Sequence, residues 1–555
     1  MTRMAGKDAL VELLRAEGIE YVFGIPGATE IHFMDALERA PDITYILGLQ
    51  EVVCAGMAEG YARASGKVGF LNLHTGPGLA AALPLLYNSY YGGVPLVITA
   101  GQNHTRLLQH DPHLTGDLVG MMKPYTKWAT EIVHPEDIGT VIQRAFKSAM
   151  QPPTGPVFVS LPQNVLAEEF EFQLTAGTTV YSRLRPDESA VDRAIQILAE
   201  ARRPVILVES GVARSGALAE VVRFAELTGA KVYQPWMSDV NFPVSHPQYL
   251  GDLDPVSRRA KEAFADADLL VGIGCSLFAE AFFNPEPTLP EGMRSLQIDD
   301  NPWELGKNFP IDCAIQGDIK TVLAELNEAL DKQSTAEKRR SIEARIAQIG
   351  QEKADQQSRL EAVFASEAHS HPISVSRLMT EVGRALRPDS VLVDECWSSS
   401  EALRQIVAPT MPGTFFRARK GGSIGWGLPG ALGVQLGLPD KDVVAVVGDG
   451  SAAWSVQSLW TAARYHIPVT FILTNNATYR QVKVVRRIVL GDYPLTERHI
   501  GMELDSPVID FAKLASSLGV KAESVTEADD LARALASNIG AGEPRLVEVF
   551  VASPS

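Results

Sequence analysis

Cysteine is scarce in this sequence, and long apolar runs are missing. Only 4 of the 555 residues are cysteine, and their spacing matches neither a metal site nor a disulfide framework. We therefore expect reduced, buried thiols and a cytoplasmic protein. No uninterrupted apolar run reaches the length of a membrane span. The first residues lead into an amphipathic helix pattern, so we expect no secretory signal there.

Basic residues are fewer than acidic ones. The chain has 50 Lys and Arg against 67 Asp and Glu, which gives a formal net charge of -17. This balance argues against nucleic acid and anionic membranes as partners. The hydrophobic content of 46% and the charged content of 21% are ordinary for a globular protein. A chain of 555 residues is long enough for about three domains, each with its own core.

Three segments of the chain alternate short β-rich runs with helical patterns. They cover residues 1–180, 185–330 and 371–555. Such alternation predicts parallel sheets with helices on both faces. Residues 331–370 are highly charged and helix-prone, and we interpret them as a surface helix and linker. The sequence therefore predicts an α/β protein with three doubly wound parallel-sheet domains.

Two neighbouring strands predicted in the third segment end in oxygen-bearing side chains. Asp449 follows the apolar run 443–447, and Asn476 follows the apolar run 469–473. Because the carboxyl ends of parallel strands meet at one edge of a sheet, these side chains and the carbonyl of Thr478 can bind one Mg²⁺ ion. A single Gly-Asp-Gly is a common turn, so the prediction depends on the βαβ unit that joins the two motifs.

The turn around Asp449 also suits a diphosphate. Gly448 and Gly450 flank the carboxylate and allow the backbone to come close to an anion. The amides of such a turn can face that anion. The sequence therefore predicts that a metal ion and a diphosphate are bound together at this edge.

A carboxylate in the first segment lies where burial is expected. Glu51 follows the apolar run 45–47 and precedes the apolar helix pattern 52–58. Carboxylates are seldom buried without a partner, and desolvation favours their protonated form. A Glu that is favoured at a helix N-terminus by the helix dipole is the alternative interpretation. Beside a metal–diphosphate site, a carboxyl that exchanges protons is the stronger prediction for Glu51.

These motifs together resemble those of thiamine diphosphate enzymes. Gly-Asp-Gly, a βαβ stretch and Asn-Asn form the metal–diphosphate signature of that family, and Glu51 matches its proton-relay Glu. The resemblance covers nearly the whole chain. The further matching stretches are Gly24–Gly27, Asn72–Gly78, Ile98–Gln102, Gly421–Pro429 and Leu459–Ala463.

The resemblance implies a pyrimidine-binding domain at 1–180, a central domain at 185–330 and a diphosphate-binding domain at 371–555. It implies thiamine diphosphate and Mg²⁺ as cofactors. The central domain binds FAD in some members of the family, but the loop Glu209–Ala213 is too weak a glycine signal to predict a nucleotide. The family also implies at least a homodimer and commonly a homotetramer.

Several residues take roles from this resemblance. Glu51 exchanges a proton with the aminopyrimidine ring, Gly422 offers its carbonyl to that ring, and Ile424 is an apolar wedge under the cofactor. Ser398 and Ser451 are assigned to the diphosphate oxygens. An ordinary core isoleucine and solvated turn serines are the alternatives.

The stretches Asn72–His74 and Trp460–Ala463 resemble benzoylformate decarboxylase in particular. Acetolactate synthase is similar in outline but lacks the His at position 74. The resemblance implies that His74 hydrogen-bonds the substrate and moves protons to and from it. A structural histidine is the alternative interpretation.

The match to benzoylformate decarboxylase breaks at two positions that handle substrate in that enzyme. Ala28 replaces a Ser, and Ala281 replaces a second His. Gln102 and His104 are predicted near the mouth of the first sheet and are the candidate replacements. The segment after Thr478 is basic, which indicates either a lid that favours an anionic substrate or a solvated helix face. From this segment we place two residues in the substrate pocket, Tyr479 and Arg480.

The resemblance implies a thiamine diphosphate-dependent lyase that cleaves a carbon–carbon bond in a small molecule. Non-oxidative decarboxylation of a 2-oxo acid such as benzoylformate to an aldehyde is the first hypothesis. A carboligase or aldehyde lyase, similar to acetolactate synthase or benzaldehyde lyase, is the alternative. A catalytically silent homologue is a third hypothesis, and Glu51 argues against it because cofactor binding alone does not need a proton relay.

Overall fold

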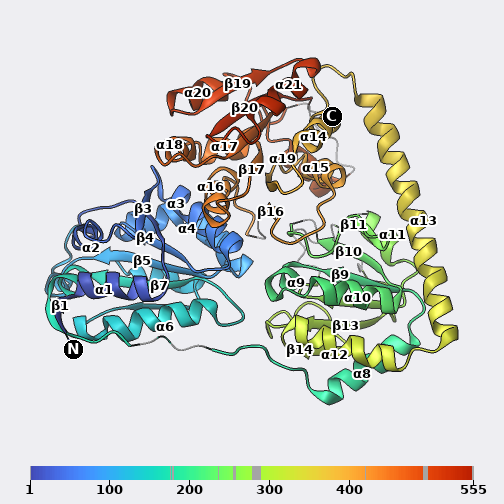
Figure 1. Ribbon diagram of the computed structural model, residues 1–555, viewed down its shortest axis with the longest axis horizontal. Coiled ribbons are helices and arrows are strands. Elements are labelled where there is room, and N and C mark those ends of the chain that lie inside the picture. Colours follow the sequence, from blue (N-terminus) through green and yellow to red (C-terminus); the bar gives the residue numbers. More distant parts are fainter. Residues whose placement is uncertain are drawn as a thin grey trace.

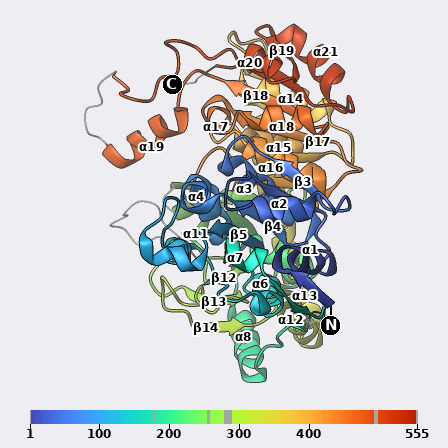
Figure 2. The same cartoon turned by 90° about the vertical axis from the view of Figure 1, so that its left-hand side faces the viewer.

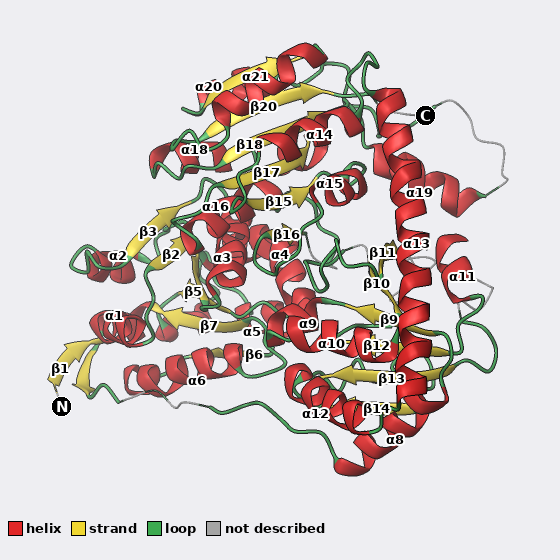
Figure 3. Ribbon diagram, turned by 45° about the vertical axis from the view of Figure 1, so that its right-hand side comes forward, coloured by secondary structure: helices red, strands yellow, loops and turns green. Residues whose placement is uncertain are grey.

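A computed structural model describes residues 2–175, 177, 180–235, 237–253, 258–277, 289–418, 421–491 and 498–552. It contains three six-stranded sheets in which all strands are parallel. Each sheet has a buried apolar cluster on both faces, beneath the helices that cover it (Figures 1 and 3). The predicted fold class of three doubly wound parallel-sheet domains is therefore confirmed.

The first sheet has the order β3-β2-β4-β5-β7-β6. Its inner strands β2, β4, β5 and β7 are short, mostly apolar runs that are buried on both sides, as is typical of parallel sheets. The strands are β2 (Tyr21–Gly24), β3 (Thr44–Leu47), β4 (Gly69–Leu73), β5 (Leu96–Gln102), β6 (Trp128–Glu131) and β7 (Val157–Pro162). The helices are α1 (Gly6–Ala16), α2 (Ile31–Leu37), α3 (Glu51–Ser65), α4 (Thr75–Gly92), α5 (Leu118–Met122), α6 (Ile138–Met150) and α7 (Gln163–Ala167). The short elements are β1 (Thr2–Ala5), which pairs with β8 (Glu169–Phe172), and the 3₁₀ turns η1 (Thr105–His110), η2 (Lys123–Tyr125) and η3 (Pro135–Asp137).

The central sheet has the order β11-β10-β9-β12-β13-β14, so the strand order reverses between β9 and β12. Its strands are β9 (Pro204–Val208), β10 (Lys231–Pro235), β11 (Tyr249–Leu253), β12 (Leu269–Ile273), β13 (Arg294–Asp299) and β14 (Cys313–Gln316). Its helices are α8 (Glu188–Glu200), α9 (Ser210–Ser215), α10 (Leu218–Thr228), α11 (Arg258–Phe264) and α12 (Ile319–Lys332).

The charged segment after the central sheet forms the long helix α13 (Ala336–Glu367). It runs along one side of the molecule from the central domain to the third domain (Figure 1). Of its side chains, Ile342 and Ile349 are buried. Arg345 donates to the carbonyls of Thr228 and Gly229 at the end of α10, which fixes the helix to the central domain. Within the described residues, no helix combines the length and the apolar character that a membrane span requires.

The third sheet has the order β16-β15-β17-β18-β20-β19. When the strands of each sheet are numbered in chain order, the third sheet has the same spatial order of strands as the first sheet. Its strands are β15 (Val391–Glu395), β16 (Phe415–Arg417), β17 (Val443–Gly448), β18 (Thr470–Asn475), β19 (Lys521–Val525) and β20 (Arg545–Phe550). Its helices are α14 (Val375–Ala385), α15 (Ser400–Val407), α16 (Gly427–Gly437), α17 (Asp449–Trp454), α18 (Ser458–Arg464), α19 (Arg480–Leu490), α20 (Phe511–Ser517) and α21 (Ala528–Asn538).

Helices α3 and α16 join the first and third domains. Both are rich in small apolar residues and are buried almost all round, which is typical of a helix inside a core. A Cβ atom at Gly60 would clash with the carbonyl oxygen of Gly430, and a Cβ atom at Gly433 would clash with that of Met57. The two backbones therefore touch only because glycines line the contact. One apolar cluster extends through this contact from the first sheet to the third.

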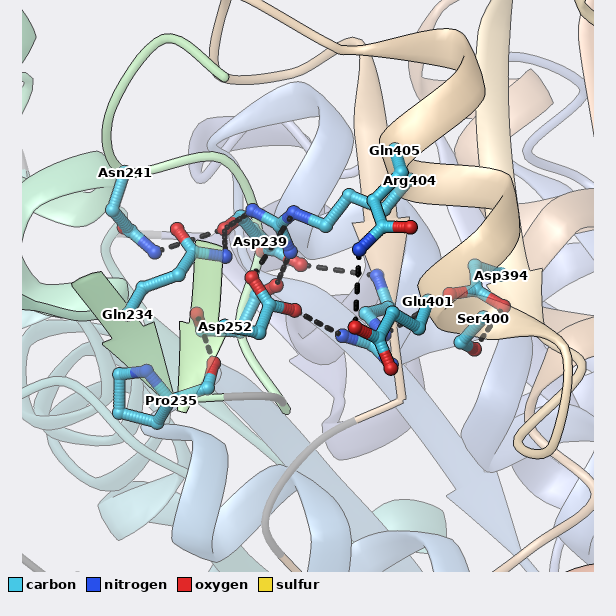
Figure 4. A network of polar contacts seen from close by, with 12 residues as sticks. Gln234, Pro235, Asp239, Asn241, Asp252, Asp394, Ser400, Glu401, Arg404 and Gln405 are labelled. Atoms are coloured by element: carbon cyan, nitrogen blue, oxygen red, sulfur yellow. Dashed lines mark hydrogen bonds and ion pairs between the residues drawn. The ribbon is translucent and has the colours of Figure 1, made fainter. Parts of the chain in front are cut away.

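A buried polar network joins the central and third domains (Figure 4). Arg404 donates to the carbonyls of Ser238 (2.9 Å) and Asp239 (3.2 Å), and its Nε lies 3.6 Å from Asp252. Arg417 pairs with the same Asp252 at 3.3 Å and with Asp394 at 3.0 Å. The Arg404 side chain is only 3% exposed, so its charge depends on these partners.

We expect the substitution Arg404→Met to lower the free energy of unfolding by about 3–5 kcal/mol, because it leaves Asp252 and two carbonyls buried with fewer donors. Urea denaturation measures the change. Arg533→Met is the control, since Arg533 is 62% exposed and pairs with Glu523 on the surface. The control substitution should lower the free energy of unfolding by at most about 1 kcal/mol. Equal stability of the two variants would contradict the importance of the network.

Candidate active site

A cavity of about 230 Å³ opens at the carboxyl edge of the third sheet. Its walls come from the ends of β15, β17 and β18, from the loop before α16 and from the start of α19. Every residue that the sequence places at the cofactor or at the substrate in this domain lines it. These are Ser398, Gly422, Ile424, Gly448, Asp449, Gly450, Ser451, Asn476, Thr478, Tyr479 and Arg480. The structure thus brings the predicted Gly-Asp-Gly and Asn-Asn motifs to one place.

Asp449 has an acceptor atom without a partner in this cavity. Its residue is 5% exposed, and its Oδ1 accepts the N–H of Gly450 at 2.9 Å. Its Oδ2 is buried and accepts no hydrogen bond from any described residue. Burial raises the pKa of the Asp449 carboxyl to about 6. A buried carboxylate oxygen of this kind is suited to a cation.

The neighbouring Asn476 and Thr478 form the other side of the predicted metal site. The Oδ1 of Asn476 accepts the N–H of Thr478 at 3.1 Å, which orients the carboxamide. The hydroxyl of Thr478 donates to the carbonyl of Met502 at 2.8 Å, so this turn is fixed from outside the cavity. Gly450 is required here, because a Cβ atom on it would overlap the ring of Tyr479.

Two residues that the sequence did not reveal hold the loop that carries Ile424. Glu395 accepts the N–H groups of Gly425, Trp426 and Gly427 at 2.7–3.2 Å. Burial raises the pKa of Glu395 to about 8, and these donors oppose that rise. Asn88 reaches from α4 of the first domain and bonds both the N–H and the carbonyl of Ser423, at 3.0 and 2.8 Å.

The second group of predicted residues lies at the carboxyl edge of the first sheet. Glu51 is the first residue of α3, and His74 follows β4. A Cβ atom at Gly78 would lie 3.1 Å from Oε1 of Glu51 and 3.5 Å from the Cβ of His74, so the two side chains are neighbours. Glu51 is half-buried, less than its pattern predicts, because it begins its helix at the open edge of the sheet.

His74 contacts a further carboxylate that the sequence analysis missed. Its Nδ1 lies 2.8 Å from Oε2 of Glu30, which is 1% exposed. Thr75, the next residue after His74, has a φ of 42°, an unusual value for a β-branched residue. Local strain of this kind is common where a side chain is held in a functional position. Sequence reasoning could have found Glu30, because it is a carboxylate in the loop that follows β2 and therefore lies at the same sheet edge as His74.

The remaining predicted residues that the structure describes do not line the cavity of the third domain, although Gln102 ends β5 at the sheet edge of His74 and Ala28 directly precedes Thr29. The amide of Gln102 is used within its own domain, since it donates to the carbonyl of Gly116 and accepts the N–H of Asn103. His104 accepts the N–H of Arg106 and begins the turn η1. Ala28 is exposed beside Thr29 and Glu30. Ala281 lies outside the residues that the structure describes.

The basic segment after Thr478 forms α19, at the border of the third domain (Figure 2). None of its residues is fully buried. Lys483 pairs with Glu503 at 2.7 Å. Arg480 lines the cavity and donates to the carbonyl of Ser398 at 3.2 Å. Arg480 thus faces the cavity and Arg487 lies on the exposed side, and a lid that favours an anionic substrate stays a prediction.

A larger cavity of about 710 Å³ lies between the first and central domains. Glu209, Ser210 and Gly274 line it at the point where the strand order of the central sheet reverses. Doubly wound sheets bind ligands at such a point.

Family models of three kinds match the chain. The thiamine pyrophosphate (thiamine diphosphate) enzyme N-terminal TPP binding domain matches residues 4–121, the central domain matches 191–326, and the C-terminal TPP binding domain matches 398–549. The chain belongs to the thiamine pyrophosphate enzyme family. The resemblance found in the sequence is thereby confirmed.

Relatives of known activity are similar over their whole length. Benzoylformate decarboxylase of Pseudomonas aeruginosa is 31% identical over 98% of this chain and 98% of its own. The acetolactate synthase large subunit of Haemophilus influenzae is 28% identical over 96% of this chain and 91% of its own. The crystal structure of benzoylformate decarboxylase from Polynucleobacter necessarius has a TM-score of 0.87 and 27% identity, with 99% of both chains covered.

Proposed function

We propose that this protein is a thiamine diphosphate- and Mg²⁺-dependent lyase that decarboxylates a small 2-oxo acid to an aldehyde. The observation that carries the proposal is that Glu51 and His74 both lie beside Gly78 at one sheet edge, together with the buried, unpartnered Oδ2 of Asp449 in the cavity of the third domain. Glu51 and His74 can move protons, and the site around Asp449 can bind a cation. Similarity to benzoylformate decarboxylase supports the choice of reaction.

The residues of the cavity fit the cofactor. Asp449, Asn476 and the carbonyl of Thr478 would hold Mg²⁺, an ion that prefers oxygen ligands. Ser398, Gly448, Gly450 and Ser451 would bind the diphosphate, and Gly422 and Ile424 would contact the rings. When bound, thiamine diphosphate supplies a nucleophilic carbon and an electron sink for the carbanion that decarboxylation leaves behind.

The protein's own residues then handle protons and orientation. When the cofactor is bound, the carboxyl of Glu51 at the N-terminus of α3 would exchange a proton with its aminopyrimidine ring. His74 exchanges protons with the bound substrate on the way to the product. Ile424 and Val482 provide apolar side chains in the cavity wall.

We further propose that two copies of the chain share each site. Among the described residues, those that line the cavity all belong to the third domain, and Glu51 and His74 are not among them. A second copy that presents its first sheet edge to this cavity would complete the site. The chain would then be at least a homodimer, and the family favours a homotetramer.

Carboligation is the second candidate, because Ala28 provides no hydroxyl next to Thr29 and Glu30. Loss of a substrate-handling group can slow protonation and leave time for attack on a second carbonyl. Similarity to the acetolactate synthase large subunit is consistent with this candidate. An aldehyde lyase is the same chemistry in the opposite direction.

Proton NMR of mixtures with thiamine diphosphate, Mg²⁺, benzoylformate and pyruvate tests the reaction. We expect benzaldehyde from benzoylformate, and its absence in Glu51→Gln because the proton relay is lost. Hydroxy ketones as the main products would assign the enzyme to the carboligases. Equal turnover by Glu51→Gln would contradict the assigned role of Glu51, and an inactive parent that binds the cofactor would favour the silent homologue.

Binding of Mg²⁺ and cofactor should depend on pH through Asp449. Burial raises the pKa of Asp449 to about 6 in the free protein, and Mg²⁺ needs the ionised form. The dissociation constant should therefore rise by about tenfold for each pH unit below about 6, and change little above about 7. Calorimetric titration measures it, with Asp449→Asn as the control that binds weakly at every pH. A constant affinity down to about pH 5 would contradict the assignment.

Complementation tests the shared site. Co-expression of Glu51→Gln with Asp449→Ala should give mixed dimers in which one site takes an intact Glu51 from one chain and an intact Asp449 from the other. About a quarter of the parent activity should return if the chains mix at random. No recovery in isolated mixed dimers would show that the two groups act within one chain.

A further inference from the structure

Glu30 is a buried carboxylate to which the proposed reaction gives no role. It lies just after β2 and directly before α2, at the same sheet edge as Glu51 and His74. Its exposed fraction is 1%, so the folded chain must compensate it with hydrogen bonds. The donors around it also determine where the proton on His74 lies.

Three donors point at the carboxylate besides His74. The N–H of Gly27 lies 3.0 Å from Oε2, and the N–H of Gly101 lies 2.9 Å from Oε1. The hydroxyl of Thr29 donates to Oε1 at 2.7 Å. Peptide N–H groups can only donate, so both oxygens of Glu30 act as acceptors. Because both of its oxygens already accept, Glu30 is an acceptor toward the imidazole as well.

The imidazole must therefore be the donor in its contact with Glu30. Nδ1 of His74 lies 2.8 Å from Oε2 of Glu30 and 3.3 Å from the hydroxyl of Thr29. That hydroxyl has one proton, which it donates to Glu30, so it accepts from Nδ1 as well. Both contacts require a proton on Nδ1. A neutral ring then has its lone pair on Nε2.

The surrounding backbone is shaped to this pair. A Cβ atom at Gly27 would overlap the imidazole of His74, and a Cβ atom at Gly101 would overlap Oε1 of Glu30. The ring is 22% exposed, and within the described chain its hydrogen bonds are those of Nδ1. Nε2 is thus left available to a substrate.

We propose that Glu30 is a positioning residue that, with Thr29, keeps the proton of His74 on Nδ1 and so makes Nε2 the atom that exchanges protons with the substrate. This inference rests on the proposed function only for its effect on turnover. The tautomer itself belongs to the protein without substrate. The arrangement matches the general rule that the partner of one ring nitrogen decides the chemistry of the other.

Nitrogen-15 NMR of the parent protein, with labelled histidine and the signal assigned by its loss in His74→Asn, tests the inference directly. We expect a protonated Nδ1 and an unprotonated Nε2 for the neutral ring. In Glu30→Gln the new side-chain amide can donate to Nδ1, so the tautomer should reverse. The control Glu131→Gln changes a carboxylate that accepts from Ser160 in the same sheet and should leave the ring unchanged.

On turnover, Glu30→Gln should lower kcat by about 10²- to 10⁴-fold, with a smaller change in KM, because Nε2 then faces the substrate with a proton in place of its lone pair. An unprotonated Nδ1 in the parent, or an unchanged tautomer in a folded Glu30→Gln protein, would overturn the inference. If Glu30→Gln does not fold, the parent spectrum alone still decides. A reversed tautomer in a protein whose parent consumes no 2-oxo acid would refute the proposed function and leave the role of Glu30 standing.

Discussion

The glycine-lined contact between α3 and α16 is the constraint on which the site depends. Glu51 is the first residue of α3, and the loop with Ile424 leads directly into α16. A side chain at Gly60 or Gly433 would push these two backbones apart and move both groups. The bonds from Asn88 to Ser423 strengthen the same contact between domains. The first and third domains of one chain are therefore held as a unit, on which two different sheet edges are displayed.

Those two edges have the same topology and different chemistry. The first and third sheets share one strand order, so corresponding strands end at corresponding places. His74 follows the third strand in sequence of the first sheet, and Asp449 follows the third strand in sequence of the third sheet. One edge has Glu51 and His74, and the other has Asp449 with its glycine turn. The proposed function assigns proton transfer to the first edge and the binding of a cation and an anion to the second.

Residues that directly follow a buried strand could be predicted from the sequence. Asp449 and Asn476 are of this kind, because an apolar run fixes where a strand ends, and parallel strands end together. Glu30, Asn88 and Glu395 were missed, although each is buried and polar. Their partners are backbone groups of Gly101, Ser423 and Gly427, which lie far away in the sequence. A local sequence pattern cannot reveal a hydrogen bond between a donor and an acceptor that come together only when the chain folds.

The sequence by itself determined the three parallel sheets, the metal–diphosphate motif and the family, since these follow from apolar periodicity and from short motifs at strand ends. The tertiary structure alone decided that Glu30 and Thr29 orient the ring of His74. It also decided that the amide of Gln102 bonds to Gly116 within its own domain and that Glu51 does not line the cavity of the third domain. The physical reason is that the direction of a side chain depends on the backbone groups around it, and these groups come from distant parts of the sequence. The order of residues along the chain does not show which of them come together.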